Sequence, residues 1–207
     1  VGEAGDINLS LAFEVLDYAL LSAPGAPLKQ ALLDAKIGKD IYGSFEDGIK
    51  QTYFSIVAKG ANLSQKEEFV KVIRDTLTKI MEEGIDKKAV TAGINYYEFR
   101  FREADFSSYP KGLMYGLDIL SSWLYDDTKP FCEVQLLEGF EFLKKALEEG
   151  YFEDLIRKYL LDNTHGAILS LVPEKGLAAK RDKELEEKLE NYRKSLSDEE
   201  LTRMVEN

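Results

Sequence analysis

The chain has 207 residues, of which 44% are hydrophobic and 31% charged, a balance typical of a folded globular protein. Its net charge of −11 argues against nucleic acid and anionic membranes as partners, because both attract basic surfaces. No apolar run is long enough to span a bilayer, and no signal peptide is visible. The single cysteine, Cys132, excludes an intrachain disulfide and favours a reducing compartment. We expect the chain to be a fragment, because it begins at Val1.

The first predicted helix spans about 9–21, with Asp6 or Asn8 as its N-cap. Apolar residues occupy most of its circumference, which predicts a helix buried on several sides. Pro24 ends this helix, because proline lacks an amide donor and clashes with the preceding turn. A second proline suits the first position of a short helix over 27–36, so two helices follow each other across a tight turn.

Two strands are predicted next, in "DIYGSFE" and "TYFSIVAK", joined as a hairpin with its turn at 46–48. Side chains of the second strand alternate between two faces, and a slip of one residue would exchange them. We expect helices over 64–83 and 86–107 to cover one face. That face would carry Phe54, Ile56 and Ala58, and the opposite face Tyr53, Ser55 and Val57.

Apolar stripes at three- and four-residue spacing predict five further helices. Ser64 with Glu67 forms the pattern of a capping box at the start of the first of them, and Asp86 caps the second. The short apolar run "AILSLV", over 167–172, predicts a strand. The five helices are expected at about 64–83, 86–107, 113–124, 136–147 and 152–160.

The tail from Glu174 onward is mostly charged but keeps a narrow apolar seam. Ser197 with Glu200 is a second capping-box pattern, so the tail predicts a helical hairpin over 174–207 behind a domain over 1–173. The predicted order is two helices, two strands, five helices, one strand and a helical hairpin. This order indicates an α+β fold, in which a layer of long helices packs on an antiparallel sheet. Because three strands are few for so many helices, we expect the first strand or strands to lie upstream. The seam consists of Leu185, Leu189, Tyr192 and Leu196.

Searches for catalytic patterns fail. The sequence contains no zinc-ligand spacing, no phosphate-binding glycine loop and no nucleophile elbow. We expect the single histidine, His165, to be a loop or strand-edge residue rather than a metal ligand. Carboxylates are abundant, but their spacing places them on solvated helix faces. We therefore predict no catalytic and no metal-binding residue in this chain.

Three segments, in order, resemble the second domain of the presequence-protease branch of the pitrilysin/insulinase metallopeptidase superfamily. They are "LDYALLSAPGAPLKQALLDAKIGKDIYGSFEDGIKQTYFSIVAKG", "FREADFSSYPKGLMYGLDILSSWLYDDTKPF" and "YLLDNTHGAILSLVPEKGLAAKRDKELEEKL". The resemblance covers essentially the whole chain.

This resemblance implies a parent enzyme of four related α+β domains, whose two halves close around peptides. Zinc and an inverted H-x-x-E-H motif would lie in the first domain, and an assisting Arg/Tyr pair in the fourth. The second domain would carry neither and would wall the chamber, leading into a helical hairpin between the halves. Tyr42 stands where the fourth domain has its tyrosine, but Lys36 or Ile37 replaces the arginine, so no catalytic role is carried over.

The site expected from the resemblance is a chamber-facing surface of Tyr42, Tyr53, Ser55 and Val57. The expected function is that of a non-catalytic domain of a zinc-dependent metalloendopeptidase that degrades peptides, inactive alone and without a cofactor of its own. Its partners would be the other domains of the same polypeptide and peptide substrates. The expected compartment is the bacterial cytoplasm, or the mitochondrial matrix in a eukaryote.

Two alternatives remain open. In the first, the chain is a free-standing helical interaction or regulatory module that binds a partner through its charged hairpin. In the second, it is an inactive subunit of a heterodimeric processing peptidase. An H-x-x-E-H motif upstream in the same reading frame would favour the peptidase domain, and a start codon at the first residue would exclude it.

Overall fold

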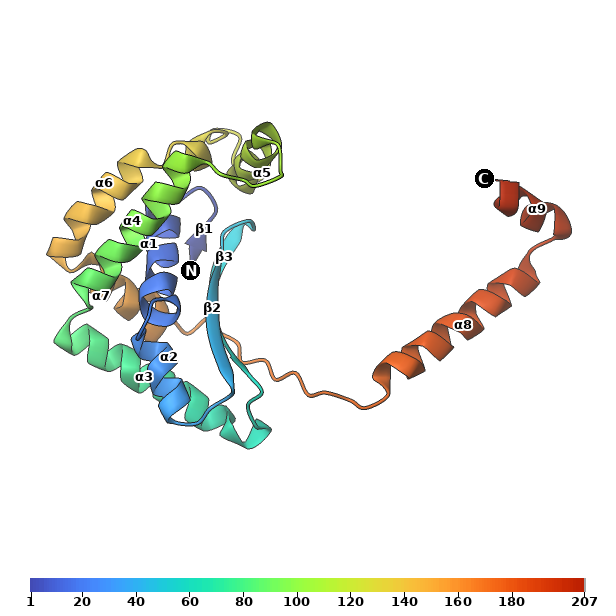
Figure 1. The fold of residues 1–207 in the computed structure, drawn as a ribbon, viewed down its shortest axis with the longest axis horizontal. Helices are drawn as coiled ribbons and strands as arrows, with labels where there is room; N and C mark the ends of the chain where they lie inside the picture. The colour runs from blue at the N-terminus through green and yellow to red at the C-terminus, as the bar shows by residue number, and fades with distance from the viewer. Residues whose placement is uncertain (207) are drawn as a thin grey trace. The chain divides into compact units, whose positions relative to one another are not determined.

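The structure, a computed structural model, describes residues 1–206, and the chain divides after Ala167 into two compact units. The first unit combines helices with a small antiparallel sheet, which confirms the predicted α+β fold (Figure 1). Its strands are β1 (Gly2–Glu3), β2 (Asp40–Glu46) and β3 (Gln51–Lys59). Its α-helices are α1 (Ile7–Asp17), α2 (Pro27–Asp34), α3 (Lys66–Glu83), α4 (Lys87–Glu103), α5 (Lys111–Trp123), α6 (Leu137–Ala146) and α7 (Tyr151–Leu155).

Helix α1 is the centre of the first unit and is buried along most of its length, as its composition predicts. The side chain of Asp6 accepts a hydrogen bond from the backbone of the first turn and caps the helix. Figure 1 shows α1 between the sheet and helices α4 and α6. Two glycines allow this close packing: a Cβ at Gly93 would lie 3.0 Å from Tyr18, and one at Gly139 would lie 2.6 Å from Leu11.

A tight turn separates α1 from α2. The first helix continues as one π-helical segment, Tyr18–Ser22, and ends just before Pro24. Gly25 has a φ of +75°, a conformation that costs glycine little, and Pro27 opens α2 where its missing amide is not needed. The two prolines and the glycine therefore redirect the chain without a long loop, as the sequence predicts.

The sheet has the order β1-β3-β2, and both pairings are antiparallel. Its third strand is β1, which the sequence did not predict, whereas the strand predicted at 167–172 is wrong. Those residues form no strand, and Leu169 and Leu171 are 83% and 89% exposed. An extended apolar segment becomes a strand only when a neighbouring strand supplies hydrogen bonds, and none does so here among the described residues.

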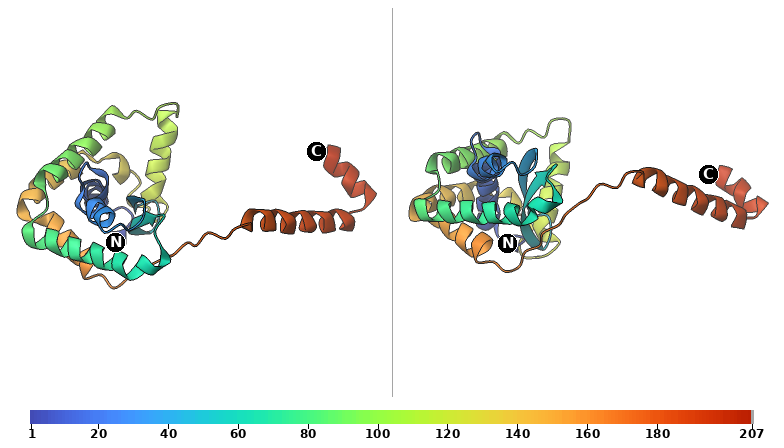
Figure 2. Two further views of the ribbon diagram at one scale, coloured as in Figure 1. Left: turned by 60° about the horizontal axis from the view of Figure 1, so that its bottom comes forward. Right: turned by 90° about the horizontal axis from the view of Figure 1, so that it is seen from below.

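The helix that covers the inner face of the hairpin is α1, so the expectation that the helices over 64–83 and 86–107 cover it is wrong. The ring of Phe13 stacks on Phe45 at 5.4 Å and lies 5.8 Å from Phe54. Because α1 is apolar on most sides, it packs on the sheet and on outer helices at once. Helices α3, α4 and α5 lie around it (Figure 2, left).

The N-terminus of α3 differs from the prediction. Instead of Ser64 and Glu67, the capping box pairs Asn62 with Gln65, whose side chain accepts a hydrogen bond from the Asn62 amide at 3.0 Å. A 3₁₀ turn precedes α3 and contains Ser64, so this serine lies inside the helical segment and cannot cap it.

The second unit contains two helices, α8 (Leu177–Ser195) and α9 (Asp198–Glu206). The predicted capping box between them is confirmed: the amide of Glu200 donates to Ser197 Oγ at 3.3 Å, and the Ser197 amide donates to Glu200 Oε2 at 2.8 Å. No side chain of α8 is buried, and the seam residues Leu185, Leu189 and Tyr192 are exposed. Over residues 1–206, no helix is both long and apolar enough to cross a membrane.

Candidate functional site

The outer face of the β2–β3 hairpin, turned away from α1, brings together all four side chains expected to face a chamber. In the antiparallel register, Tyr42 lies opposite Val57. Tyr53 and Ser55 follow on the same face, because side chains in a strand alternate with period two. The structure therefore unites four residues on one surface, although Tyr42 comes from a different strand. Whether that surface lines a chamber remains a prediction.

Two side chains join this surface that the sequence reasoning did not name. Ser44 lies opposite Ser55, and their hydroxyl oxygens are 2.9 Å apart; Glu46 lies opposite Tyr53. The predicted turn at 46–48 could not have found them, because β2 continues to Glu46 and the turn lies at 47–50; the observed pairs have residue numbers that sum to 99, whereas a turn centred on 47 gives about 94. We call these six residues the outer face: Tyr42, Ser44, Glu46, Tyr53, Ser55 and Val57.

The outer face is exposed and chemically mixed. Both tyrosines are 48% exposed, although large aromatic side chains are usually more buried. Their rings offer apolar contact, and their hydroxyls and the serine pair offer hydrogen bonds. The inner face is apolar by contrast, with Ile41 fully buried and Phe54 packed on the core. Such a face is suited to bind an extended peptide rather than to catalyse a reaction.

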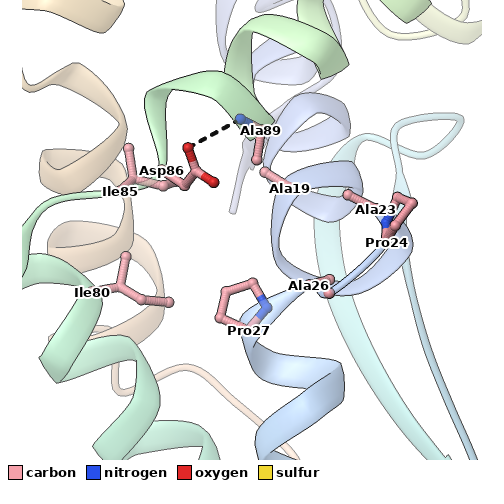
Figure 3. Close-up of a pocket in the computed structure, with 10 residues that line it drawn as sticks. Ala19, Ala23, Pro24, Ala26, Pro27, Ile80, Ile85, Asp86 and Ala89 are labelled. Atoms are coloured by element: carbon pink, nitrogen blue, oxygen red, sulfur yellow. Dashed lines mark hydrogen bonds between the residues drawn. The ribbon is translucent and has the colours of Figure 1, made fainter.

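A small hollow lies at the turn between α1 and α2 (Figure 3). It is lined by apolar side chains such as Pro27 and Ile80, and its one carboxylate is that of Asp86. This carboxylate already caps α4, because it accepts hydrogen bonds from the amides of Lys88 at 2.9 Å and Ala89 at 3.4 Å. The hollow is therefore a packing feature of the turn, and its carboxylate serves as a helix cap.

The two side chains with the clearest metal-binding or nucleophilic character lie apart from the outer face. Cys132 donates a weak hydrogen bond to the Lys129 carbonyl at 3.3 Å, and His165 is exposed in a segment without regular structure. Across the described residues, no group of three or more His, Cys, Asp or Glu side chains is arranged to hold a metal ion.

The fold of the first unit has a counterpart among solved structures. It is similar to the inactive peptidase domain of a protein described as a zinc protease from Bordetella parapertussis, with a TM-score of 0.57 over 72% of this chain and 79% of that chain. The two sequences are 11% identical, so this match shows a shared fold alone. Residues 3–97 also match the family model described as "Peptidase M16 inactive domain". This part of the chain is therefore similar in sequence to the inactive domain of M16 peptidases.

Curated relatives extend the similarity to the whole chain. Protein HypA of Clostridium perfringens is 44% identical over 207 residues, which is all of this chain and 21% of that protein. Presequence protease 1, chloroplastic/mitochondrial, of Arabidopsis thaliana is 33% identical over 205 residues, covering 97% of this chain and 19% of that protein. The predicted resemblance to a non-catalytic domain of the presequence-protease type is thus confirmed. The chain spans about a fifth of the length of these relatives.

Proposed function

We propose that this chain is a non-catalytic domain that forms part of the wall of a peptide-degrading chamber in a larger zinc-dependent metalloendopeptidase. Zinc and its ligands belong, in this proposal, to another domain of the same polypeptide. Support comes from the inactive-domain match and from relatives named presequence proteases that are about five times longer. We further propose that the parent works in the bacterial cytoplasm, or in the mitochondrial matrix of a eukaryote.

One observation supports this function most strongly: the outer face is exposed, mixed in chemistry and backed by a rigid core. The stack of Phe13 on Phe45 and the packing of Phe54 fix the hairpin from behind. Tyr42 and Tyr53 are therefore presented on a rigid strand pair, and a bound peptide would not have to order a loop. Contacts of this kind contribute to peptide affinity without acting on the scissile bond.

The proposal is tested by kinetics in the full-length polypeptide that contains this segment. Tyr53→Ala and Tyr42→Ala should each raise KM for a fluorogenic peptide by roughly 3–10-fold, with kcat changed by less than about twofold. The physical reason is that both side chains would contact the peptide equally in the ground state and in the transition state.

The matched control is Tyr109→Ala, because Tyr109 is 64% exposed but lies in the loop before α5. Tyr109→Ala should leave both KM and kcat unchanged. Wild-type KM in both outer-face variants, or an equal effect in the control, would contradict a peptide-binding role for this surface.

A second candidate is an interaction module, and the exposed seam of α8 favours it. Leu185, Leu189 and Tyr192 are 54–57% exposed and spaced as in a coiled-coil helix that lacks its partner. In the first proposal this seam would pack on another part of the parent, whereas in the second it would bind a separate protein. The reading frame around this segment distinguishes them, because only the first requires an H-x-x-E-H motif in the same polypeptide.

A further inference from the structure

Helix α5 carries an apolar face that the rest of the first unit leaves exposed. Leucines recur along it at four- and three-residue spacing, the pattern of a helix that packs on a core. They and the neighbouring tryptophan are nevertheless between 40% and 68% exposed. Both views of Figure 2 show α5 at the rim of the first unit. We call these five residues the α5 face: Leu113, Leu117, Leu120, Trp123 and Leu124.

The same kind of stripe has the opposite environment in α3. There Leu77 is only 2% exposed, and Phe69 and Ile73 pack on the core of the first unit. Among the described residues, none from α5 belongs to that core or packs against it. The α5 face is therefore not part of the interior that this domain builds for itself.

Local contacts hold α5 in place without covering its apolar face. The buried hydroxyl of Ser122 donates to the Lys129 carbonyl at 3.0 Å. The hydroxyl of Tyr125, just after the helix, donates to the Gly48 carbonyl of the hairpin turn at 3.3 Å. A helix of 13 residues is marginal in water without apolar packing, so a partner that buried this face would stabilise it.

The area of the α5 face suits an interface between domains. The exposed parts of its five side chains amount to roughly 500 Å², more than the about 400 Å² of contiguous apolar surface that suits a face left in water. Burial against an equal area would remove roughly 1,000 Å² from water. That value lies within the range of about 600–1,500 Å² for contacts between domains of one chain.

A glycine within the α5 face also indicates a partner. Gly116 lies on the same side of the helix as Leu113 and Leu120, because residues three and four apart are neighbours on a helix surface. A Cβ at Gly116 would meet no atom within 4 Å, so no contact within the described chain requires a glycine here. Glycine destabilises a helix interior relative to alanine. Close approach of another surface would give it a role.

We propose that the α5 face packs on an apolar surface of another domain of the same polypeptide. The inference rests on the proposed function, in which this chain is one domain of a larger protein. The relatives support this occupant, because the chain spans only 21% of the Clostridium protein and 19% of the Arabidopsis protease. Linkage within one polypeptide also provides a high effective concentration, so a face of modest area suffices.

The test is hydroxyl-radical footprinting read by mass spectrometry. It compares the dilute 207-residue chain with the full-length polypeptide that contains it, without added peptide. Oxidation of Trp123 and of the leucines of the α5 face should be at least fivefold slower in the full-length polypeptide. The control is Phe99, which is 64% exposed on α4 and lies outside the face, and it should react equally in both proteins.

Equal oxidation of the α5 face in the two proteins would overturn the inference. Slow oxidation of the face already in the dilute 207-residue chain would also overturn it, because the chain would then cover the face by itself.

A charge substitution tests the contact in a second way. Leu117→Glu should leave the melting temperature of the 207-residue chain within about 2 °C of the wild type, because this side chain is 51% exposed there. In the full-length polypeptide, Leu117→Glu should speed the oxidation of Trp123 at least threefold, since a carboxylate is costly in an apolar contact. Phe99→Glu is the matched control and should do neither. Unchanged oxidation of Trp123 in the full-length variant would overturn the inference.

Other occupants give different results, each of which would overturn the inference. A dimer of the 207-residue chain in sedimentation velocity, abolished by Leu117→Glu, would assign the face to a second copy. Protection in the full-length polypeptide that appears only when peptide is added with a chelator would assign it to the substrate.

The outcomes also separate this inference from the proposed function. A protected α5 face together with wild-type KM in Tyr42→Ala and Tyr53→Ala would support the domain contact and count against a peptide-binding outer face. An unprotected α5 face together with raised KM in those variants would reject the contact and retain the outer face.

Discussion

At the scale of single residues, Phe13 explains why the two faces of the hairpin differ. Its ring contacts Phe45 and Phe54 from one side, and the edge of Tyr159 meets it at 5.7 Å. Side chains that point toward α1 therefore join the core, while their neighbours in sequence, such as Tyr53, remain exposed. The packing of Phe13 of α1 against the hairpin therefore determines which face of the hairpin is exposed and can contact a ligand.

This difference predicts opposite behaviour for two adjacent residues. Phe54→Ala should reduce the free energy of unfolding by about 3 kcal/mol, because it removes a ring packed on the core. Tyr53→Ala should cost less than about 1 kcal/mol, since half of its surface is already exposed. Urea denaturation followed by circular dichroism measures both. A larger loss for Tyr53→Ala would show that the two faces are exchanged.

Sequence patterns predict individual caps when one residue alone decides the geometry. Asp6, Asp86 and Ser197 are short polar side chains placed directly before a helix, and each caps as expected. Ser64 fails because Asn62 starts the helical segment two residues earlier, through a 3₁₀ turn that no pattern announces.

At the scale of elements, the helices follow their apolar stripes, whereas the strands depend on partners far away in the sequence. Strand β1 is two residues long and pairs with β3, which the local sequence cannot reveal. The apolar run over 167–172 has the composition of a strand but finds no partner among the described residues. Hairpin β2–β3 was predictable, because its partners lie next to each other in the chain.

The second unit should be the least protected element. Helix α8 has no buried residue, and its stability depends on local hydrogen bonds and on side-chain pairs such as Lys194 with Glu190 at 2.8 Å. Amide hydrogen exchange should therefore be fast along α8 and slow in α1, whose side chains form the core.

Equal protection of α8 and α1 in the dilute chain would contradict this expectation. The measurement should be repeated at several protein concentrations, because self-association through the exposed seam would slow exchange in α8 only when the chain is concentrated.

At the scale of the whole molecule, the chain combines the fold of an inactive peptidase domain with an exposed outer face on its hairpin. The fold class and the four outer-face residues were predictable from alternation and from the resemblance. The exposure of that face was not, because it depends on which helix packs behind the hairpin. The central claim is that this domain contributes to peptide binding rather than to catalysis.

That claim is tested most directly by photocrosslinking in the full-length polypeptide. Tyr53 is replaced by benzoylphenylalanine, a chelator is added to prevent turnover, and a labelled peptide is irradiated with the protein. We predict a peptide adduct at position 53 that excess unlabelled peptide suppresses, and no such adduct with the same replacement at Tyr109. Absence of an adduct at position 53, or equal labelling at both positions, would contradict the account.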